Sequence, residues 1–406
     1  MRVVETFSGI GSQFKALKNI KIEHNIVATV EWDINAIYAY DIIHNGEQTY
    51  THYNNLSKTE LIDKLSRFTL SGNGKSPLEK NSYKVMPENS LRRILYAIER
   101  TKNLVSITDV SAMDLPEDID LLTYSFPCQD LSICGSWHGN MTGINRDANN
   151  RSGMLWEVER ILQEYVKLKI KLPKFLLMEN VSNILSETHK HNFDEWKDYL
   201  KSIGYYNKVY TLNAANFGLP QRRVRTYMIS ILSNETQKTE IDEYFNSNDL
   251  SKLKLELEPL VSYLRTDYTQ EKYKLEADIS NPNDTPSRTK IFEGNAILYG
   301  GKEIPLTVKT ITTKQDRNPN SGLILYKSDF PNKAPYRNLT PRECFLLMGF
   351  EEDDFQLLMD NNIEMKRNYK FFSREKLIRL AGNSIAVPVL EHIFMQIYYI
   401  YRNIVE

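Results

Sequence analysis

The sequence predicts an α/β protein: a parallel sheet covered by helices, joined to a smaller, mostly β domain. Strand-like and helix-like stretches alternate through the first 44 residues, at 3–7, 12–19, 26–30 and 33–44. The alternation resumes after a polar interval, at 104–107, 121–126, 154–167, 175–178, 193–203, 206–213 and 225–232. Such alternation is typical of parallel sheets with crossover helices. Two of the strands, 121–126 and 175–178, have the apolar composition expected of buried parallel strands.

Three segments follow from this pattern. Residues 1–232 form the first domain, interrupted at about 46–103 by a polar insertion with its own helix near 91–100. After Ser233 the periodicity weakens and Glu, Lys, Asn and Asp dominate, so we expect a second domain at 233–335. Within it, 296–299 and 323–326 resemble strands. Residues 336–406 end in an amphipathic helix whose apolar stripe runs from Ile385 to Ile400.

Composition limits the possible functions. The chain has 406 residues, 41% of them hydrophobic and 25% charged, which suits a soluble protein of two domains. A formal net charge of −1 gives no support to nucleic-acid binding by itself. The three cysteines are an odd number without a Cys-x-x-Cys pair, so we expect neither a disulfide framework nor a metal site. Without a signal-like or membrane-spanning apolar run, we expect a cytoplasmic location and no membrane association.

Two predicted strands deliver reactive side chains. The strand at 121–126 leads into Pro127-Cys128-Gln129, and the strand at 175–178 leads into Glu179-Asn180-Val181. Open α/β sheets place their active sites at the carboxyl ends of the strands. We therefore expect the thiol of Cys128 and the carboxyl group of Glu179 to share one cleft. Taken alone, Cys128 could equally be a buried structural thiol, and Glu179 a surface or capping carboxylate.

The first strand ends in Phe7-Ser8-Gly9-Ile10-Gly11 before a helix, an arrangement that lets a ligand approach the backbone. Phe14 stands where a dinucleotide fingerprint has its third glycine, which makes a pyrophosphate ligand less favoured. Glu31 closes the next strand at the position of an acid that receives ribose hydroxyls. Trp32 offers a flat face for an adenine ring, with core packing as its alternative role.

Together these motifs resemble those of the DNA (cytosine-5-)-methyltransferases. The resemblance also includes Asp109-Val110, Gln221-Arg222-Arg223-Val224-Arg225 and the segments 151–156, 337–343 and 382–387, in the family's order. It covers about 1–44, 104–232 and 336–406. It implies a Rossmann-like catalytic domain that binds S-adenosylmethionine and a smaller target-recognition domain. In the family, the terminal helix packs back onto the catalytic domain.

The resemblance also assigns residue roles. Cys128 would be the nucleophile that adds to carbon 6 of cytosine, and Glu179 the acid that protonates or hydrogen-bonds ring nitrogen 3. The other residues with expected catalytic or supporting roles are Asn180, Gln221, Arg223 and Arg225. The expected cofactor-binding residues are Phe7, Gly9, Gly11, Glu31, Trp32, Asp109, Val110, Pro127, Leu155, Asn383 and Ser384. A solvated basic turn is the alternative for the arginines.

The expected substrate is double-stranded DNA with the target cytosine rotated out of the stack. Lys314, Gln315 and Arg317 in the second domain are candidates to read base edges, with a polar surface loop as their alternative. Bacterial members of the family commonly accompany a restriction endonuclease, so a cognate endonuclease is a candidate partner. We expect a monomer.

Three other functions compete with this one. A transfer-RNA cytosine methyltransferase built on the same motifs usually has a much smaller recognition segment than the hundred or so residues present here. A catalytically silent DNA-binding protein would be expected to lose Cys128, Glu179 or the arginines. A dinucleotide oxidoreductase would leave Pro-Cys-Gln and Glu-Asn-Val without a role.

Overall fold

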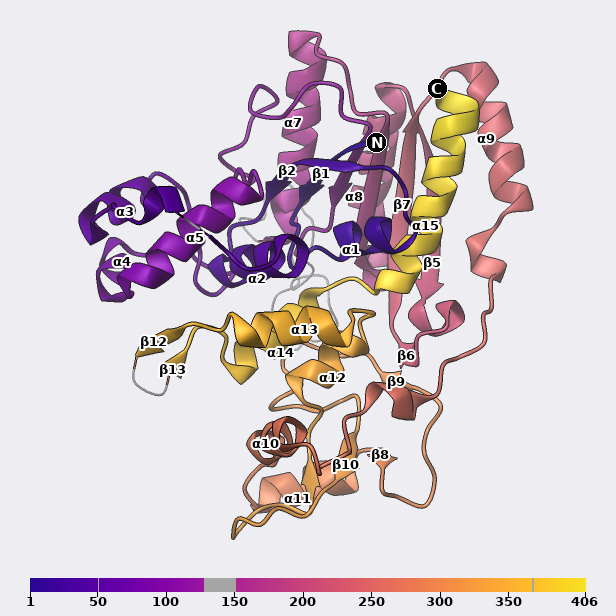
Figure 1. Ribbon diagram of the computed structural model, residues 1–406. Helices are drawn as coiled ribbons and strands as arrows, with labels where there is room; N and C mark the ends of the chain where they lie inside the picture. Colours follow the sequence, from indigo (N-terminus) through magenta and orange to yellow (C-terminus); the bar gives the residue numbers. More distant parts are fainter. Residues whose placement is uncertain (50, 128–150, 367–368) are drawn as a thin grey trace. The chain divides into compact units, whose positions relative to one another are not determined.

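The computed structural model describes residues 1–49, 51–127, 151–366 and 369–406, which form two compact units (Figure 1). The first unit consists of Met1–Leu212, Val224–Lys252 and Leu390–Glu406, and the second of Asn213–Arg223 and Leu253–Val389. These limits differ from the domain limits expected from sequence, since residues 213–223 and 336–389 group with the second unit. The functional roles given to the expected domains stay predictions.

The first unit is built on a six-stranded sheet with the strand order β2-β1-β3-β4-β7-β5. Its strands are β1 (Arg2–Thr6), β2 (Asn25–Val30), β3 (Leu121–Tyr124), β4 (Phe175–Val181), β5 (Tyr205–Asn213) and β7 (Val224–Leu232). Strands β1 to β4 are parallel, as predicted, but β7 is antiparallel to β4, so the sheet is mixed. Only residues 214–223 separate β5 from β7, which is shorter than the crossover that a parallel pair needs.

Helices cover both faces of this sheet (Figure 1). Val4, Leu122 and Leu176 share one face, where they pack in one cluster with α7 (Leu155–Leu168) and α8 (Glu187–Ser202). The residues that alternate with them point to the opposite face. On that face lie α1 (Ser12–Asn19), α2 (Ile34–Asn45) and α15 (Val387–Ile400), which continues as a π-helix, Tyr401–Val405. Helix α9 (Glu235–Ser247) follows β7.

The strand predicted at 104–107 does not form, and this prediction is wrong. Val105 has a φ of 70°, which a continuous strand does not allow. The side chain of Asn103 takes the place of strand pairing: its amide donates to Glu31 O (2.9 Å) and accepts from Glu31 N (3.0 Å). The segment therefore meets the edge of β2 through a single bridge and then turns away.

The insertion carries three helices, α3 (Lys58–Leu65), α4 (Lys80–Val85) and α5 (Glu88–Arg100). The predicted helix at 91–100 is confirmed as part of α5, which packs against α2 and α3. Arg100 attaches the insertion to the sheet domain, because its Nε lies 2.6 Å from Oδ1 of the fully buried Asp41 on α2.

Residues 233–335 were expected to form a mostly β domain, and this is wrong, because more of these residues lie in helices than in strands. The second unit includes this stretch from Leu253 onward. Its helices are α10 (Glu271–Ser280), α11 (Pro286–Glu293), α12 (Pro341–Leu346), α13 (Glu352–Asp360) and α14 (Arg374–Asn383). Its strands are short: β6 (Gln221–Arg222), β8 (Ile297–Tyr299), β9 (Val308–Lys309), β10 (Leu323–Leu325), β11 (Tyr336–Arg337), β12 (Glu364–Lys366) and β13 (Tyr369–Lys370). The two strand-like pieces seen in the sequence do become β8 and β10, which pair. Helix-start signals at Thr285-Pro286 and Thr340-Pro341 were available in the sequence, and both threonines cap their helices.

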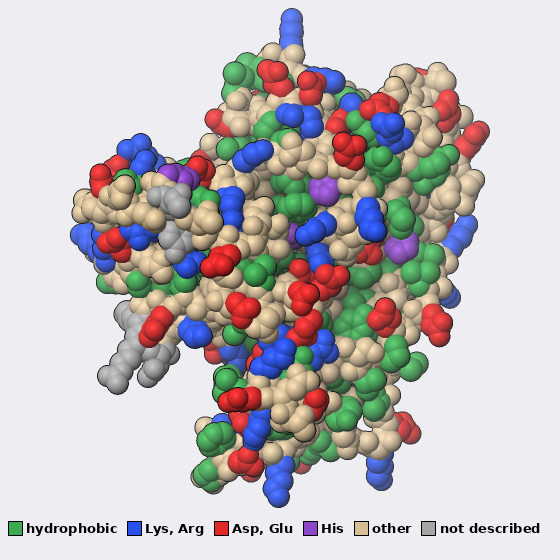
Figure 2. Space-filling model, viewed as in Figure 1, with side chains coloured by type: hydrophobic (Ala, Val, Ile, Leu, Met, Phe, Trp, Pro, Cys, Tyr) green, Lys and Arg blue, Asp and Glu red, His purple; other side chains and the backbone are tan. Residues whose placement is uncertain are grey.

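One helical stretch among the described residues, Arg374–Val405, contains a window apolar enough to cross a membrane, with a mean hydropathy of 1.2. Within the structure, 72% of that window is buried. Core helices of soluble proteins have the same property. On the molecular surface, acidic and basic side chains are interspersed over the face shown in Figure 2, in keeping with the net charge of −1.

Candidate active site

The glycine loop after β1 has the backbone that its sequence predicts. Gly9 and Gly11 adopt φ values of 55° and 79°, and Gly11 is the N-cap of α1. A Cβ atom on Gly11 would lie 2.2 Å from Nε2 of His44, so only glycine fits there. A Cβ atom on Gly9 would meet no described atom within 4 Å, which leaves open space beside the loop. Phe7, with a φ of 54°, is half-buried at the start of this loop.

Glu31 lies at the carboxyl end of β2, beside the glycine loop. Its Oε2 accepts a hydrogen bond from the N–H of Gly9 (3.0 Å), and its Oε1 accepts one from the N–H of Asp33 (2.9 Å). Burial, together with the nearby charge of Asp33, raises the pKa of Glu31 to about 7. Trp32 follows it and is half-buried, so part of its indole surface remains open to a ligand.

A second buried acid, Glu5, lies on β1 two residues before Phe7. It is fully buried, and its Oε2 accepts a hydrogen bond from the hydroxyl of Tyr40 (2.7 Å). Burial raises the pKa of Glu5 to about 7. We did not expect Glu5 to matter from the sequence, although a charged residue inside an apolar strand is a signal in itself.

The remaining cofactor candidates of the first unit differ in exposure. Asp109 is exposed and Val110 is buried at the end of the irregular segment after Leu104. Arg160 of α7 holds this segment, since its Nη2 donates to Val110 O (2.7 Å) and Ile107 O (3.2 Å). Leu155, the first residue of α7, is fully buried in the core cluster between this helix and the sheet. Its side chain therefore packs against the sheet.

The end of β4 brings three predicted catalytic residues together with the end of β3. Because β7 runs antiparallel to β4, Arg225 lies beside Glu179, with 3.4 Å between Nε and Oε1, and both side chains are largely buried. Asn180, 2% exposed, donates from Nδ2 to Phe126 O (3.1 Å). The bond joins the ends of β4 and β3, directly before the half-buried Pro127. Cys128, which follows, lies outside the described residues.

Gln221 and Arg223 lie in the second unit and are buried there. Gln221 donates from Nε2 to Leu347 O (2.6 Å) and accepts at Oε1 from Ile311 N (3.0 Å). Arg223 donates to three backbone carbonyls, those of Ile311 (3.1 Å), Gly382 (3.1 Å) and Ser384 (2.7 Å). In this structure both side chains hold the backbone of the unit.

The other predicted residues of the second unit are divided between surface and interior. Asn383 is exposed at the end of α14, whereas Ser384 is buried and donates from Oγ to Leu380 O (3.0 Å). Lys314 and Arg317 are exposed, and Arg317 pairs with Asp316. Gln315 between them is fully buried.

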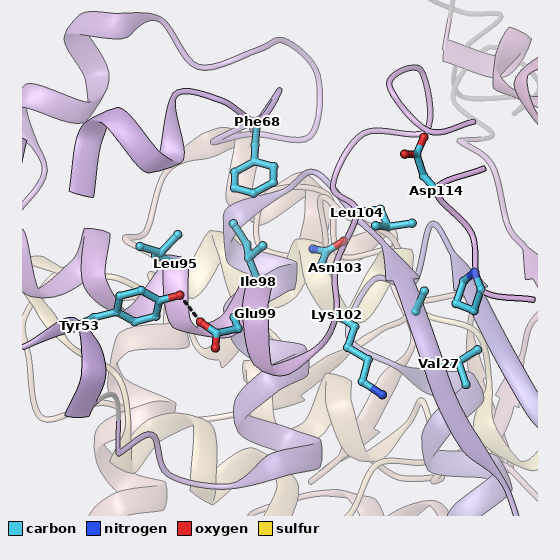
Figure 3. A pocket seen from close by; sticks show the side chains of 12 residues that line it. Val27, Tyr53, Phe68, Leu95, Ile98, Glu99, Lys102, Asn103, Leu104 and Asp114 are labelled. Carbon is cyan, nitrogen blue, oxygen red and sulfur yellow. Dashed lines mark hydrogen bonds between the residues drawn. The ribbon is translucent and has the colours of Figure 1, made fainter. Parts of the chain in front are cut away.

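A cavity of about 340 Å³ opens beside β2 and α5 (Figure 3). Glu99 is among its lining side chains and accepts a hydrogen bond from the hydroxyl of Tyr53, and most of the other lining side chains are apolar. The lining residues are Val27, Ala28, Tyr53, Phe68, Leu95, Ile98, Glu99, Lys102, Asn103, Leu104, Asp114 and Pro116. None of the predicted cofactor residues is among them, so this cavity is separate from the predicted cofactor site. Elsewhere in the described ranges, no cluster of three or more His, Cys, Asp or Glu side chains could hold a metal ion.

Comparison with known proteins places the chain in a family. The model of the family "C-5 cytosine-specific DNA methylase" matches residues 80–399. The orphan methyltransferase M.SssI of Spiroplasma monobiae is 36% identical over 98% of this chain and 97% of its own. The type II methyltransferase M2.ScrFI of Lactococcus lactis subsp. cremoris is 32% identical over 98% and 99%. Among solved structures, the S. pombe Dnmt2 methyltransferase aligns with a TM-score of 0.59 at 17% identity, covering 99% of both chains.

The α/β fold expected from sequence is thus confirmed, and so is the family that the motifs resemble. The alignments with M.SssI and M2.ScrFI cover 98% of the chain, whereas the family model matches only residues 80–399. The chain belongs to the C-5 cytosine-specific DNA methylases and is a DNA (cytosine-5-)-methyltransferase.

Proposed function

We propose that this enzyme methylates carbon 5 of a flipped cytosine, within a specific duplex DNA sequence, through a covalent adduct with Cys128. The observation that carries the proposal is the junction of β3 and β4. There Asn180 binds the carbonyl of Phe126, two residues before Cys128, and Glu179 is its neighbour in the chain. This hydrogen bond ties the carboxyl ends of two adjacent parallel strands together, and the proposed nucleophile and acid belong to the motifs at these two ends, which supports the proposal.

The chemistry assigned to these residues follows from the electronic structure of cytosine. Carbon 5 becomes nucleophilic when the thiolate of Cys128 adds to carbon 6. Glu179 stabilises this adduct by protonating or hydrogen-bonding ring nitrogen 3, and Arg225 orients the Glu179 carboxyl group from 3.4 Å. Carbon 5 then takes the methyl group, which leaves S-adenosylhomocysteine, and gives its proton to solvent as the thiolate of Cys128 leaves; a proton that Glu179 placed on nitrogen 3 returns to Glu179, and the aromatic ring is restored.

S-adenosylmethionine is the methyl donor of this family and supplies the electrophilic methyl group when bound. The residues around the glycine loop fit it. The space beside Gly9 admits a ligand next to the backbone, the Glu31 carboxyl group can accept ribose hydroxyls, and the half-open indole of Trp32 can stack on adenine. Phe7, Gly11, Asp109, Val110, Pro127, Leu155, Asn383 and Ser384 complete the proposed cofactor-binding set. We propose no metal cofactor.

On the DNA side, the exposed Lys314 and Arg317 are the better candidates for contact with base edges or phosphates. Gln315 would have to leave the interior to reach a base. The buried Gln221 and Arg223 would act through the backbone that they hold. We further propose that the enzyme is a cytoplasmic monomer and that a restriction endonuclease acting on the same site is a candidate partner.

The test is transfer of labelled methyl from S-adenosylmethionine to unmethylated duplex DNA, followed by sequencing for 5-methylcytosine. DNA containing 5-fluorocytosine should trap the enzyme covalently, because the fluorine cannot leave as the proton does. Cys128→Ala should abolish both labelling and trapping. Cys344→Ala is the matched control, since Cys344 is buried in α12 of the second unit. Labelling of DNA that persists in Cys128→Ala would refute the covalent mechanism. Transfer RNA is assayed in parallel as a second substrate, and methyl label in it would show that the enzyme also acts on RNA.

A further inference from the structure

A loop of the insertion, residues 70–78, is attached to the chain that follows β2. The N–H of Ser71 donates to Trp32 O (2.7 Å), and the N–H of Ile34 donates to Ser71 O (2.9 Å). These two bonds bracket Asp33. A third bond runs from Nδ2 of Asn35 to Gly72 O (3.0 Å). The insertion thus holds the backbone on both sides of the segment that contains Trp32 and Asp33.

The hydrogen bonds continue from this segment to the glycine loop. Oδ1 of Asp33 accepts from the backbone N–H of Asn35 (3.0 Å) and from its Nδ2 (2.7 Å). The N–H of Asp33 donates to Glu31, which in turn accepts from Gly9. Asn35 and Ser71 are fully buried, and Asp33 is 6% exposed. Hydrogen bonds shielded from water in this way hold their groups more rigidly than exposed ones.

The loop keeps its shape through its own side chains. Oγ of Ser71 donates to Ser76 O (2.6 Å) and accepts from Gly74 N (3.0 Å). Oδ1 of Asn73 accepts from the N–H groups of Lys75 (2.8 Å) and Ser76 (3.1 Å). Ser71 therefore both shapes the loop and supplies the backbone groups that hold the segment after β2.

We propose that loop 70–78 positions the cofactor site, with Ser71 and Asn35 as positioning residues that fix Trp32 and Glu31 for the adenosine part of S-adenosylmethionine. The inference rests on the cofactor site proposed above and gives a role to an insertion that lies mostly outside the motifs. A binding site that is ordered before the ligand arrives gives a higher affinity, because less conformational entropy is lost on binding. Without the loop's bonds, Trp32 and Asp33 would have to be ordered by the ligand.

The test uses Asn35→Ala and Ser71→Ala in the full-length protein. The affinity for S-adenosylmethionine is measured by calorimetry, and KM and kcat are measured on duplex DNA. Each variant should raise the Kd and the KM for the cofactor about fivefold, the effect of one net hydrogen bond. At saturating cofactor, kcat should stay within about twofold of the wild type. Ser71→Thr keeps the hydroxyl group and should restore the affinity.

Ser57→Ala is the matched control in the same insertion. Ser57 caps α3 through hydrogen bonds to Glu60, so its loss should lower the melting temperature without changing cofactor affinity. The proposal is overturned if the Ser71 and Asn35 variants melt earlier, as Ser57→Ala does, while their Kd for the cofactor equals that of the wild type. A rise in the KM for DNA alone would overturn it too. A wild-type protein that binds no S-adenosylmethionine would instead refute the cofactor site itself.

Discussion

Glu5→Gln should stabilise the protein, by an amount that depends on pH. Glu5 is fully buried on β1, and its pKa rises from 4.5 to about 7. A raised pKa in the folded state means that the protonated acid contributes stability below about pH 4.5, and that this stability is lost as pH rises through 7. The shift corresponds to about 3 kcal/mol. Gln keeps an acceptor for Tyr40 and cannot ionise, so the variant avoids this loss.

The measurement is urea unfolding at pH 5 and pH 8, followed by tryptophan fluorescence. Trp32, Trp156 and Trp196 all lie in the first unit and report on the sheet that contains Glu5. The stability difference between Glu5→Gln and wild type should grow by about 2.5 kcal/mol from pH 5 to pH 8, slightly less than the full shift because pH 5 already lies above the unfolded pKa of 4.5. Glu31 titrates in the same range but is present in both proteins, so its effect cancels.

A substitution that leaves every titratable group in place provides the control for Glu5→Gln. Thr239→Ser on α9, at an exposed position, should show a difference from wild type that does not change with pH. If the difference for Glu5→Gln is also the same at pH 5 and pH 8, Glu5 is not a buried acid that ionises near neutrality, and the reasoning fails.

Four further outcomes are expected. Glu179→Gln should lower kcat by about 10²- to 10⁴-fold with cofactor affinity unchanged by calorimetry, and an unaltered kcat would remove Glu179 from the mechanism. Gly11→Ala should cost about 2–4 kcal/mol in urea unfolding because of its positive φ and the contact with His44. Arg223→Ala should cost about 3 kcal/mol because three buried carbonyls lose their donor, whereas a loss of activity at full stability would instead indicate direct contact with DNA. Lys314→Ala should weaken DNA binding and lower the slope of log K against log salt by about 1, and an unchanged slope would place Lys314 away from phosphate.

The parts of the fold that the sequence predicted are those with local signals. The strands predicted at 121–126 and 175–178 have mostly apolar sequences and form as β3 and β4, and the helix at 12–19 has its predicted limits. The pairing of β7 was not predictable in this way, because periodicity marks a strand without giving its direction. The strand predicted at 104–107 was wrong for a related reason. Its apolar residues suit a strand, but the side chain of Asn103 makes the hydrogen bonds to the backbone of Glu31 that a neighbouring strand would make.

In the candidate site, too, local motifs were predictable from the sequence and long-range packing was not. The motifs named Glu179, Asn180 and Arg225 as candidate catalytic residues, and the structure places Arg225 of β7 beside Glu179 at the end of β4, where Asn180 also lies. The buried states of Arg223 and Gln315 could not be read from the chain, since a basic or polar run looks the same whether it faces solvent or carbonyls. Which polar residues are enclosed is decided by long-range packing.

The composition of the first unit from three separate stretches has a consequence for synthesis on the ribosome. Its last stretch, from Leu390 onward, contributes Gln396, which bonds to Asn248 and to the hydroxyl of Tyr210, and Tyr401, whose ring meets Phe175 of β4. One face of the nascent sheet therefore lacks this cover until Leu390 and the residues after it have been synthesised. A premature stop before Leu390 would release a chain with exposed apolar strands, a substrate for chaperones and proteases, and the cell would be protected from a half-made modifying enzyme.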